Sequence, residues 1–136
     1  VHIRNSGKEV AQAIEEQHFG NGGILHCFTE DWALAKRMMD HDFFISFSGI
    51  LTFPKAQPLR EVAEKIPLEK LLVETDSPYL VPFPLRDEKK RNEPAHLIET
   101  AKVLAGIKKI SLDKLAFATS QNFESLFMFE IKNLRC

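Results

Sequence analysis

Three side chains with the chemistry of metal ligands stand within or at the ends of apolar runs. His2 lies in residues 1–4, His26 lies in residues 23–28, and Asp76 closes the run that begins at Leu71. An aspartate at the end of an apolar run is costly to bury unless it is paired or bound to a metal. Two histidines and a carboxylate suit zinc or another borderline divalent ion. They therefore predict a hydrolytic metal site, in which a carboxylate beside the ion takes a proton from bound water.

Each of these residues also has a plainer interpretation. A short His-x-Arg motif such as His2-Ile3-Arg4 is more often an exposed terminal pair, and a lone histidine on an apolar strand, such as His26, is more often a hydrogen-bonded core residue. Asp76 could instead cap the turn that begins at Ser77-Pro78. Each of the three strand ends carries a possible metal ligand, and this repetition favours one shared site over three unrelated residues.

Charged neighbours extend the candidate site. Glu74 shares a strand face with Asp76 and is expected either to support the ligands or to pair with a lysine. Arg4 shares a strand face with His2 and could meet an anionic substrate group, as could Arg86. For the basic run at residues 89–91 a solvated surface is the favoured interpretation, with phosphate neutralisation as the alternative.

The elements that must position these side chains alternate between strands and helices. Strands are expected at residues 23–28, 43–49 and around 71–74, with the last few residues of a fourth strand at 1–4. Helices are expected at residues 8–19, 30–41 with Thr29 as N-cap, 59–65, 94–107 and 115–129. This alternation predicts a parallel sheet with right-handed crossovers, and ligands gather at the carboxyl ends of such strands. We therefore expect an α/β fold in which parallel (β/α) units form roughly the second half of a TIM-like barrel. Residues 1–136 would be one partial domain, with the N-terminal half absent.

Composition and charge exclude few classes of function. The 136 residues are 44% hydrophobic and 27% charged, with a net charge of −1, which argues weakly against a protein that holds DNA mainly by its phosphates. No apolar run reaches the roughly 20 residues of a membrane span, so no membrane partner is expected. Cys27 and Cys136 are the only cysteines, which argues against a disulfide framework and predicts a reducing, cytoplasmic setting.

The same residues carry a resemblance to a known family. The run Glu74-Thr75-Asp76-Ser77-Pro78-Tyr79, preceded by Pro67 and by Leu71-Leu72, resembles the TatD-type metal-dependent deoxyribonucleases of the amidohydrolase superfamily. The resemblance covers nearly the whole chain, and its Glu-Thr-Asp-x-Pro-Tyr element is highly specific. It also runs through residues 1–4, 25–28, 45–53, 82–86 and 92–94.

The resemblance implies a TIM-like barrel that cleaves phosphodiester bonds, with DNA as the substrate. It implies one or two divalent ions (zinc, magnesium or manganese) at the carboxyl face. His2 and His26 would ligate one metal, and Asp76 would ligate the other and help to activate the water. The family's first-strand His-x-His pair and bridging glutamate are not in these 136 residues.

Three functions stay open at this point. The first is a metal-dependent deoxyribonuclease, the second is a non-catalytic half barrel that acts at most as an association module, and the third is a hydrolase of a small amide or ester. A half barrel would leave open strand edges and unpartnered inward side chains. Association with a second copy or with the absent half is therefore expected.

Overall fold

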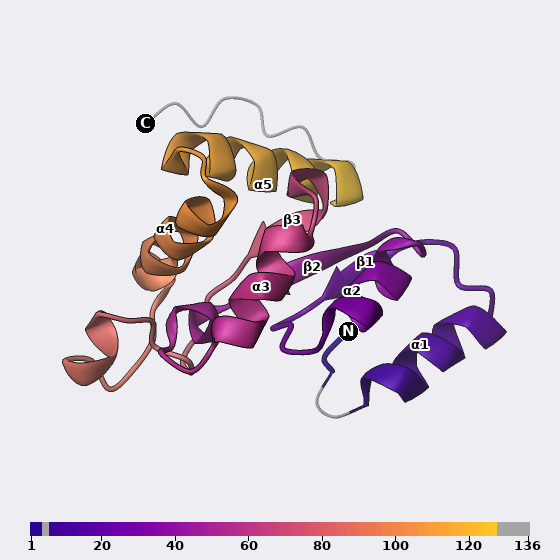
Figure 1. Ribbon diagram of the computed structural model, residues 1–136, viewed down its shortest axis with the longest axis horizontal. Coiled ribbons are helices and arrows are strands. Elements are labelled where there is room, and N and C mark those ends of the chain that lie inside the picture. Colours follow the sequence, from indigo (N-terminus) through magenta and orange to yellow (C-terminus); the bar gives the residue numbers. More distant parts are fainter. Residues whose placement is uncertain (4–5, 128–136) are drawn as a thin grey trace.

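A three-stranded parallel sheet forms the centre of the computed structural model, which describes residues 1–3 and 6–127 (Figure 1). The strands β1 (Gly23–Leu25), β2 (Phe43–Phe47) and β3 (Leu71–Val73) lie in that order. Leu25 is in register with Ile45, which is in register with Leu71. All three strands therefore end at one edge of the sheet, and the predicted parallel β/α units are confirmed.

Helices connect these strands and follow the last of them. They are α1 (Gly7–Glu16), α2 (Trp32–Met39), α3 (Gln57–Lys65), α4 (Leu97–Lys108) and α5 (Leu112–Phe127), with short 3-10 turns η1 (Gly49–Thr52), η2 (Leu68–Lys70), η3 (Leu85–Asp87) and η4 (Pro94–His96). In Figure 1, α5 lies across the end of the sheet where β3 begins, and α1 is the outermost helix. Within the described residues, no helix combines the length and apolar character needed to cross a membrane.

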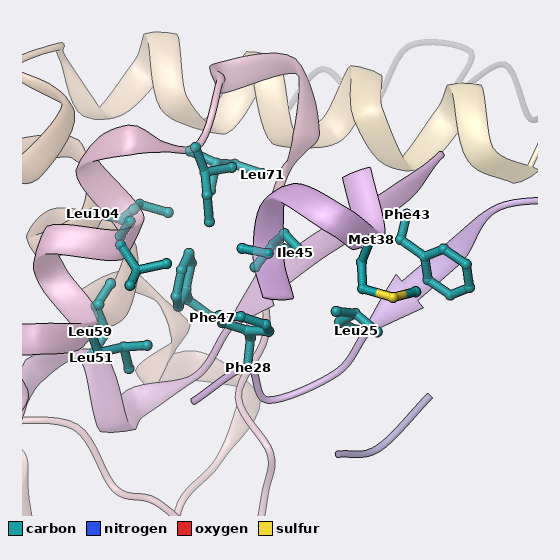
Figure 2. Close-up of a cluster of buried hydrophobic side chains, with 14 of the residues drawn as sticks. Leu25, Phe28, Met38, Phe43, Ile45, Phe47, Leu51, Leu59, Leu71 and Leu104 are labelled. Carbon is teal, nitrogen blue, oxygen red and sulfur yellow. The ribbon is translucent and has the colours of Figure 1, made fainter. Parts of the chain in front are cut away.

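The alternating side chains of β2 divide the core from the site. Phe43, Ile45 and Phe47 belong to the buried apolar cluster, which also contains Met38 of α2 and Leu104 of α4 (Figure 2). Because successive side chains of a strand point to opposite faces, the residues between them face the other side of the sheet. The buried Ser46 is one of these, so the sheet carries a hydroxyl on the face opposite the helices.

Two local predictions need correction. The N-cap of α2 is Asp31 rather than Thr29, because Asp31 directly precedes the helix in an extended conformation and its carboxylate accepts from Leu34 N at 2.9 Å. The expected fourth strand end is confirmed only as a single parallel bridge between His2 and His26.

Candidate metal centre

His26, Glu74 and Asp76 form a compact group at the carboxyl edge of the sheet. His26 directly follows β1, and both acidic residues follow β3. Ligand atoms of the three residues all lie within 4.8 Å of one another. Glu74 Oε1 is 2.6 Å from His26 Nδ1, and Asp76 Oδ1 is 3.2 Å from His26 Nε2. The imidazole therefore has a carboxylate at each of its nitrogens, which puts one nitrogen ligand and two oxygen ligands within reach of a single ion.

The side chain of Glu74 is held from the neighbouring strand. Its backbone N–H donates to Phe47 O at 3.0 Å, and the Ser46 hydroxyl donates to its Oε2. Its Oε1 is buried and, despite its closeness to His26, makes no hydrogen bond with any described residue. A buried carboxylate oxygen without a hydrogen bond is costly, so this atom is poised for a positively charged partner. Glu74 thus belongs to the cluster itself, and its carboxylate contacts His26 rather than a lysine.

Asp76 reaches the cluster because the chain turns sharply after β3. Its backbone is left-handed, with φ of 57°, which aspartate tolerates better than most residues. The turn is closed without the Asp76 carboxylate, since Tyr79 N donates to the main-chain Asp76 O at 2.9 Å and Ser77 N donates to the Thr75 hydroxyl oxygen at 3.2 Å. The capping role considered for the Asp76 side chain is therefore filled by other atoms, and its carboxylate is left to face His26.

Asn92 fixes this turn from a distant part of the chain. Its side-chain amide donates to Thr75 O at 2.8 Å, and its main-chain N–H donates to Pro78 O at 3.0 Å. Asn92 is only 2% exposed, so these bonds are shielded from water. The sequence predicts Asn92 only as part of a helix start, whereas the structure shows it supporting the loop that presents Asp76.

His2 lies beside the cluster rather than within it. Its ring centroid is 5.4 Å from that of His26, and both His2 and Asp76 line a hollow of about 590 Å³. Arg4, the other predicted residue of this segment, lies outside the described residues. Of the three predicted ligands, the structure therefore brings His26 and Asp76 into contact and puts His2 at their side.

Cys27 is a nucleophile candidate that the site keeps neutral. Burial raises the pKa of its thiol, and the negative charges of Asp76 and Glu74 raise it further against the opposing effect of the Ser48 hydroxyl. Its Sγ lies 3.2 Å from Ser48 Oγ. A protonated, buried thiol is a poor nucleophile and a poor ligand, so the chemistry rests on the carboxylates and imidazoles.

Arg86, the second predicted substrate cation, is placed on η3 and is exposed. Its guanidinium carbon lies 4.3 Å from the ring centroid of Phe53. It does not line the hollow that contains Asp76, but it lines the adjoining one. Its location is therefore at the rim of the site rather than at the ligands.

The donor set fits a divalent ion. One imidazole and two carboxylates from the ends of two strands are ligands that zinc accepts, and magnesium and manganese favour the carboxylates. A cation among them would give Glu74 Oε1, which is buried and makes no hydrogen bond with any described residue, a charged partner in addition to its contact with His26. The residues present thus match the predicted cofactor class.

Comparison with known proteins agrees with this chemistry. A family model named TatD related DNase matches residues 1–128. The uncharacterized metal-dependent hydrolase YcfH of Escherichia coli K12 is 43% identical over 136 residues, which cover 99% of this chain and 51% of YcfH. The uncharacterized metal-dependent hydrolase YabD of Bacillus subtilis is 37% identical over 128 residues, which cover 93% of this chain and 49% of YabD. The chain spans about half the length of the curated relatives it matches.

Solved structures show the same fold. YJJV, a TatD homologue from Escherichia coli K12, superposes with a TM-score of 0.84 at 25% identity, over 95% of this chain and 49% of YJJV. An uncharacterized amidohydrolase from Saccharomyces cerevisiae superposes with a TM-score of 0.77 at 19% identity, over 93% of this chain and 52% of the yeast protein, a likeness of fold alone. These matches confirm the prediction that parallel β/α units here form part of a TIM-like barrel.

Proposed function

This chain belongs to the family of TatD-related DNases, and from that premise we propose that its site serves divalent-metal-dependent hydrolysis of phosphodiester bonds in DNA. The observation that carries the proposal is the group of His26, Glu74 and Asp76, with ligand atoms within 4.8 Å of one another. The group stands at the carboxyl edge of a parallel sheet, where the substrates of barrel enzymes bind. Relatives that are named as metal-dependent hydrolases support the reaction class.

The residues divide the work by their surroundings. A divalent ion bound here supplies Lewis acidity and a water of lowered pKa. Glu74, whose side chain is 18% exposed and held by Ser46, is suited to binding the ion. Asp76, whose side chain is 24% exposed and lines the open hollow, can also take the proton of the attacking water. His26 completes the ligand set, and His2 is proposed as a further ligand from its position at the side.

Positively charged side chains near the hollow that contains Asp76 favour an anionic substrate. Arg86 stands at the rim, and Arg4 is proposed as a second cation that meets a phosphate. Neutral amides and esters would gain nothing from these guanidinium groups, whereas each nucleotide of DNA carries a negative phosphate. A second metal ion would need more ligands, and we propose that a second copy of the chain, or the additional half that its relatives possess, supplies them.

A cleavage assay with three substrates tests the proposal. The protein is incubated with zinc, magnesium or manganese and with labelled DNA, a small carboxylic ester or a small amide. DNA cleavage is expected, with loss in EDTA and recovery when the ion is restored. Asp76→Asn should lower kcat by about 10²- to 10⁴-fold, while the exposed Asp40→Asn serves as the matched control. Ester or amide hydrolysis without DNA cleavage would reassign the substrate, and no turnover with any ion would leave the non-catalytic half barrel.

A further inference from the structure

A basic hollow adjoins the candidate metal centre. It has a volume of about 430 Å³, and its lining residues are Pro78, Tyr79, Leu80, Val81, Arg86, Lys89 and Lys90. Tyr79 and Leu80 also line the 590 Å³ hollow that contains His2 and Asp76. The two hollows are therefore neighbours that share a wall, and a polymeric substrate held at the metal centre can continue into the basic one.

The cations of this hollow face a common space. Asp87 and Glu88 are exposed in the same loop, yet neither lines the hollow, and of the loop's four cations Arg86, Lys89 and Lys90 line it whereas Arg91 does not. Arg86 is steadied by the Phe53 ring, which lies 4.3 Å from its guanidinium carbon. An arginine whose guanidinium lies over an aromatic ring can still use its N–H groups for hydrogen bonds, and these groups suit phosphate oxygens.

Tyr79 stands between the two hollows with an unusually open ring. It is 70% exposed, which is a large aromatic surface to leave in water. The turn that carries it is fixed, since Tyr79 N donates to Asp76 O at 2.9 Å and Asn92 N donates to Pro78 O at 3.0 Å. A few solvent-facing rings beside a positive groove are the usual platforms on which nucleic-acid bases stack.

We propose that this hollow is a second nucleotide subsite of the DNA substrate, an inference that rests on the proposed function. Arg86, Lys89 and Lys90 bind the phosphate next to the scissile one, and the Tyr79 ring stacks on the base between them. A solvated surface, the interpretation favoured by the sequence for residues 89–91, accounts for the exposure of the lysines. It does not account for their convergence with Arg86 beside an exposed aromatic ring.

Binding measured without catalysis tests the phosphate contacts. Fluorescence anisotropy with a short labelled DNA oligonucleotide in EDTA gives the affinity at several salt concentrations, with no cleavage. The double variant Lys89→Ala/Lys90→Ala should bind a single-stranded oligonucleotide more weakly. Its salt dependence, the slope of log affinity against log salt, should fall by up to about 0.7, the contribution of the one phosphate that these cations share. The control Lys36→Ala/Lys114→Ala removes the same charge from exposed positions on α2 and α5 and should keep the original slope. An unchanged slope in the first variant, or an equal fall in both, overturns the inference.

The stacking contact has its own signature. Tyr79→Leu should weaken oligonucleotide binding by about 5- to 100-fold with an unchanged salt slope, whereas Tyr79→Phe should retain the affinity because the ring remains. Equal affinities for the leucine and phenylalanine variants would remove Tyr79 from the subsite. These binding results stand apart from the cleavage assay. If the protein does not hydrolyse DNA, the proposed reaction is wrong. If the lysine and tyrosine variants bind the oligonucleotide as their controls do, the subsite is wrong.

Discussion

The side-chain amide of Asn92 donates to the backbone carbonyl oxygen of Thr75 at 2.8 Å. Thr75 immediately precedes Asp76, so this bond orients the part of the chain from which a candidate metal ligand projects. Loss of a group that orients a ligand in this way typically lowers metal affinity by about 10- to 100-fold. The geometry of the centre therefore depends on a residue whose amide groups bond to backbone carbonyls of the turn and not to the ligand atoms.

Asn92→Ala should weaken divalent-ion binding by about 10- to 100-fold, because the turn that presents Asp76 loses its anchor. It should also lower the free energy of unfolding by about 1–3 kcal/mol, because a buried carbonyl loses its donor. Isothermal titration with zinc or manganese measures the first effect, and urea denaturation of the metal-free protein measures the second.

Asn122→Ala is the matched control for this prediction. Asn122 is also buried, and its amide donates to two carbonyls, Leu68 O at 2.9 Å and Leu71 O at 2.8 Å, at the beginning of β3. The Asn122→Ala variant should lose about as much stability as Asn92→Ala and should keep the metal affinity of the parent. The positioning role of Asn92 fails if both variants lose metal affinity in proportion to their stability.

Ser46→Ala should lower metal affinity by about tenfold or more, because Glu74 Oε2 loses the hydroxyl that orients it. Ser48→Ala removes an equally buried hydroxyl from the same region, but its partner is Cys27 Sγ at 3.2 Å. The Ser48 variant should therefore bind metal as the parent does. Equal affinities for the two variants, measured by competition with a coloured chelator, would argue that Ser46 has no role in the site.

Gly49→Ala should destabilise the protein by about 1–3 kcal/mol and weaken metal binding, because the new methyl group meets backbone. A Cβ at Gly49 would lie 2.0 Å from Leu80 O, so the segment that follows the Asp76 turn must move. In contrast, a Cβ at Gly106 in α4 meets nothing within 4 Å, and Gly106→Ala should stabilise the helix by about 0.5–1 kcal/mol. Thermal unfolding of both variants checks the opposite signs, and a neutral Gly49→Ala would contradict the packing described here.

The contact between α1 and α2 should make stability depend on acidic pH. The guanidinium of Arg37 donates to both oxygens of Glu15 at 2.5 Å and holds the pKa of that carboxyl below its ordinary value, with a smaller contribution from His41. A lowered folded-state pKa means that the stabilisation is present above the ordinary value of 4.5 and is lost as pH falls through the folded-state pKa. Urea denaturation between neutral pH and pH 3 should show this loss in the parent and in Glu16→Gln. The loss of stability at acidic pH should be smaller in Glu15→Gln. If stability falls in parallel in all three proteins, the Arg37–Glu15 pair is not its cause.

Much of the fold follows from hydrophobic patterning. The run at residues 43–47 is buried along its whole length, as a central parallel strand requires, and the three strand–helix units come in the expected order. Boundaries depended on finer interactions, as at the start of α2, where Asp31 rather than Thr29 caps the helix. The strand expected at residues 1–4 was also longer than the one observed. Among the described residues, this segment pairs with the sheet only through the bridge between His2 and His26.

The candidate site was predictable where ligand chemistry coincides with strand ends. His26 and Asp76 meet that condition, and the structure brings them together. Ser46 could have been found as a hydroxyl inside an apolar run, since a buried polar group implies a partner. Asn92 carried no comparable signal, because its contact with Thr75 depends on a left-handed turn and a loop path that no local pattern encodes.

Metal binding by the purified protein tests the central claim most directly. Equilibrium dialysis against zinc, magnesium or manganese, followed by elemental analysis, compares the parent with Glu74→Gln, Asp76→Asn and the control Asp40→Asn. We predict at least one bound ion per chain in the parent and the control, and affinity lower by more than about 100-fold in the two cluster variants. A parent that binds none of these ions, or cluster variants that bind them as the control does, would contradict a metal centre built from His26, Glu74 and Asp76.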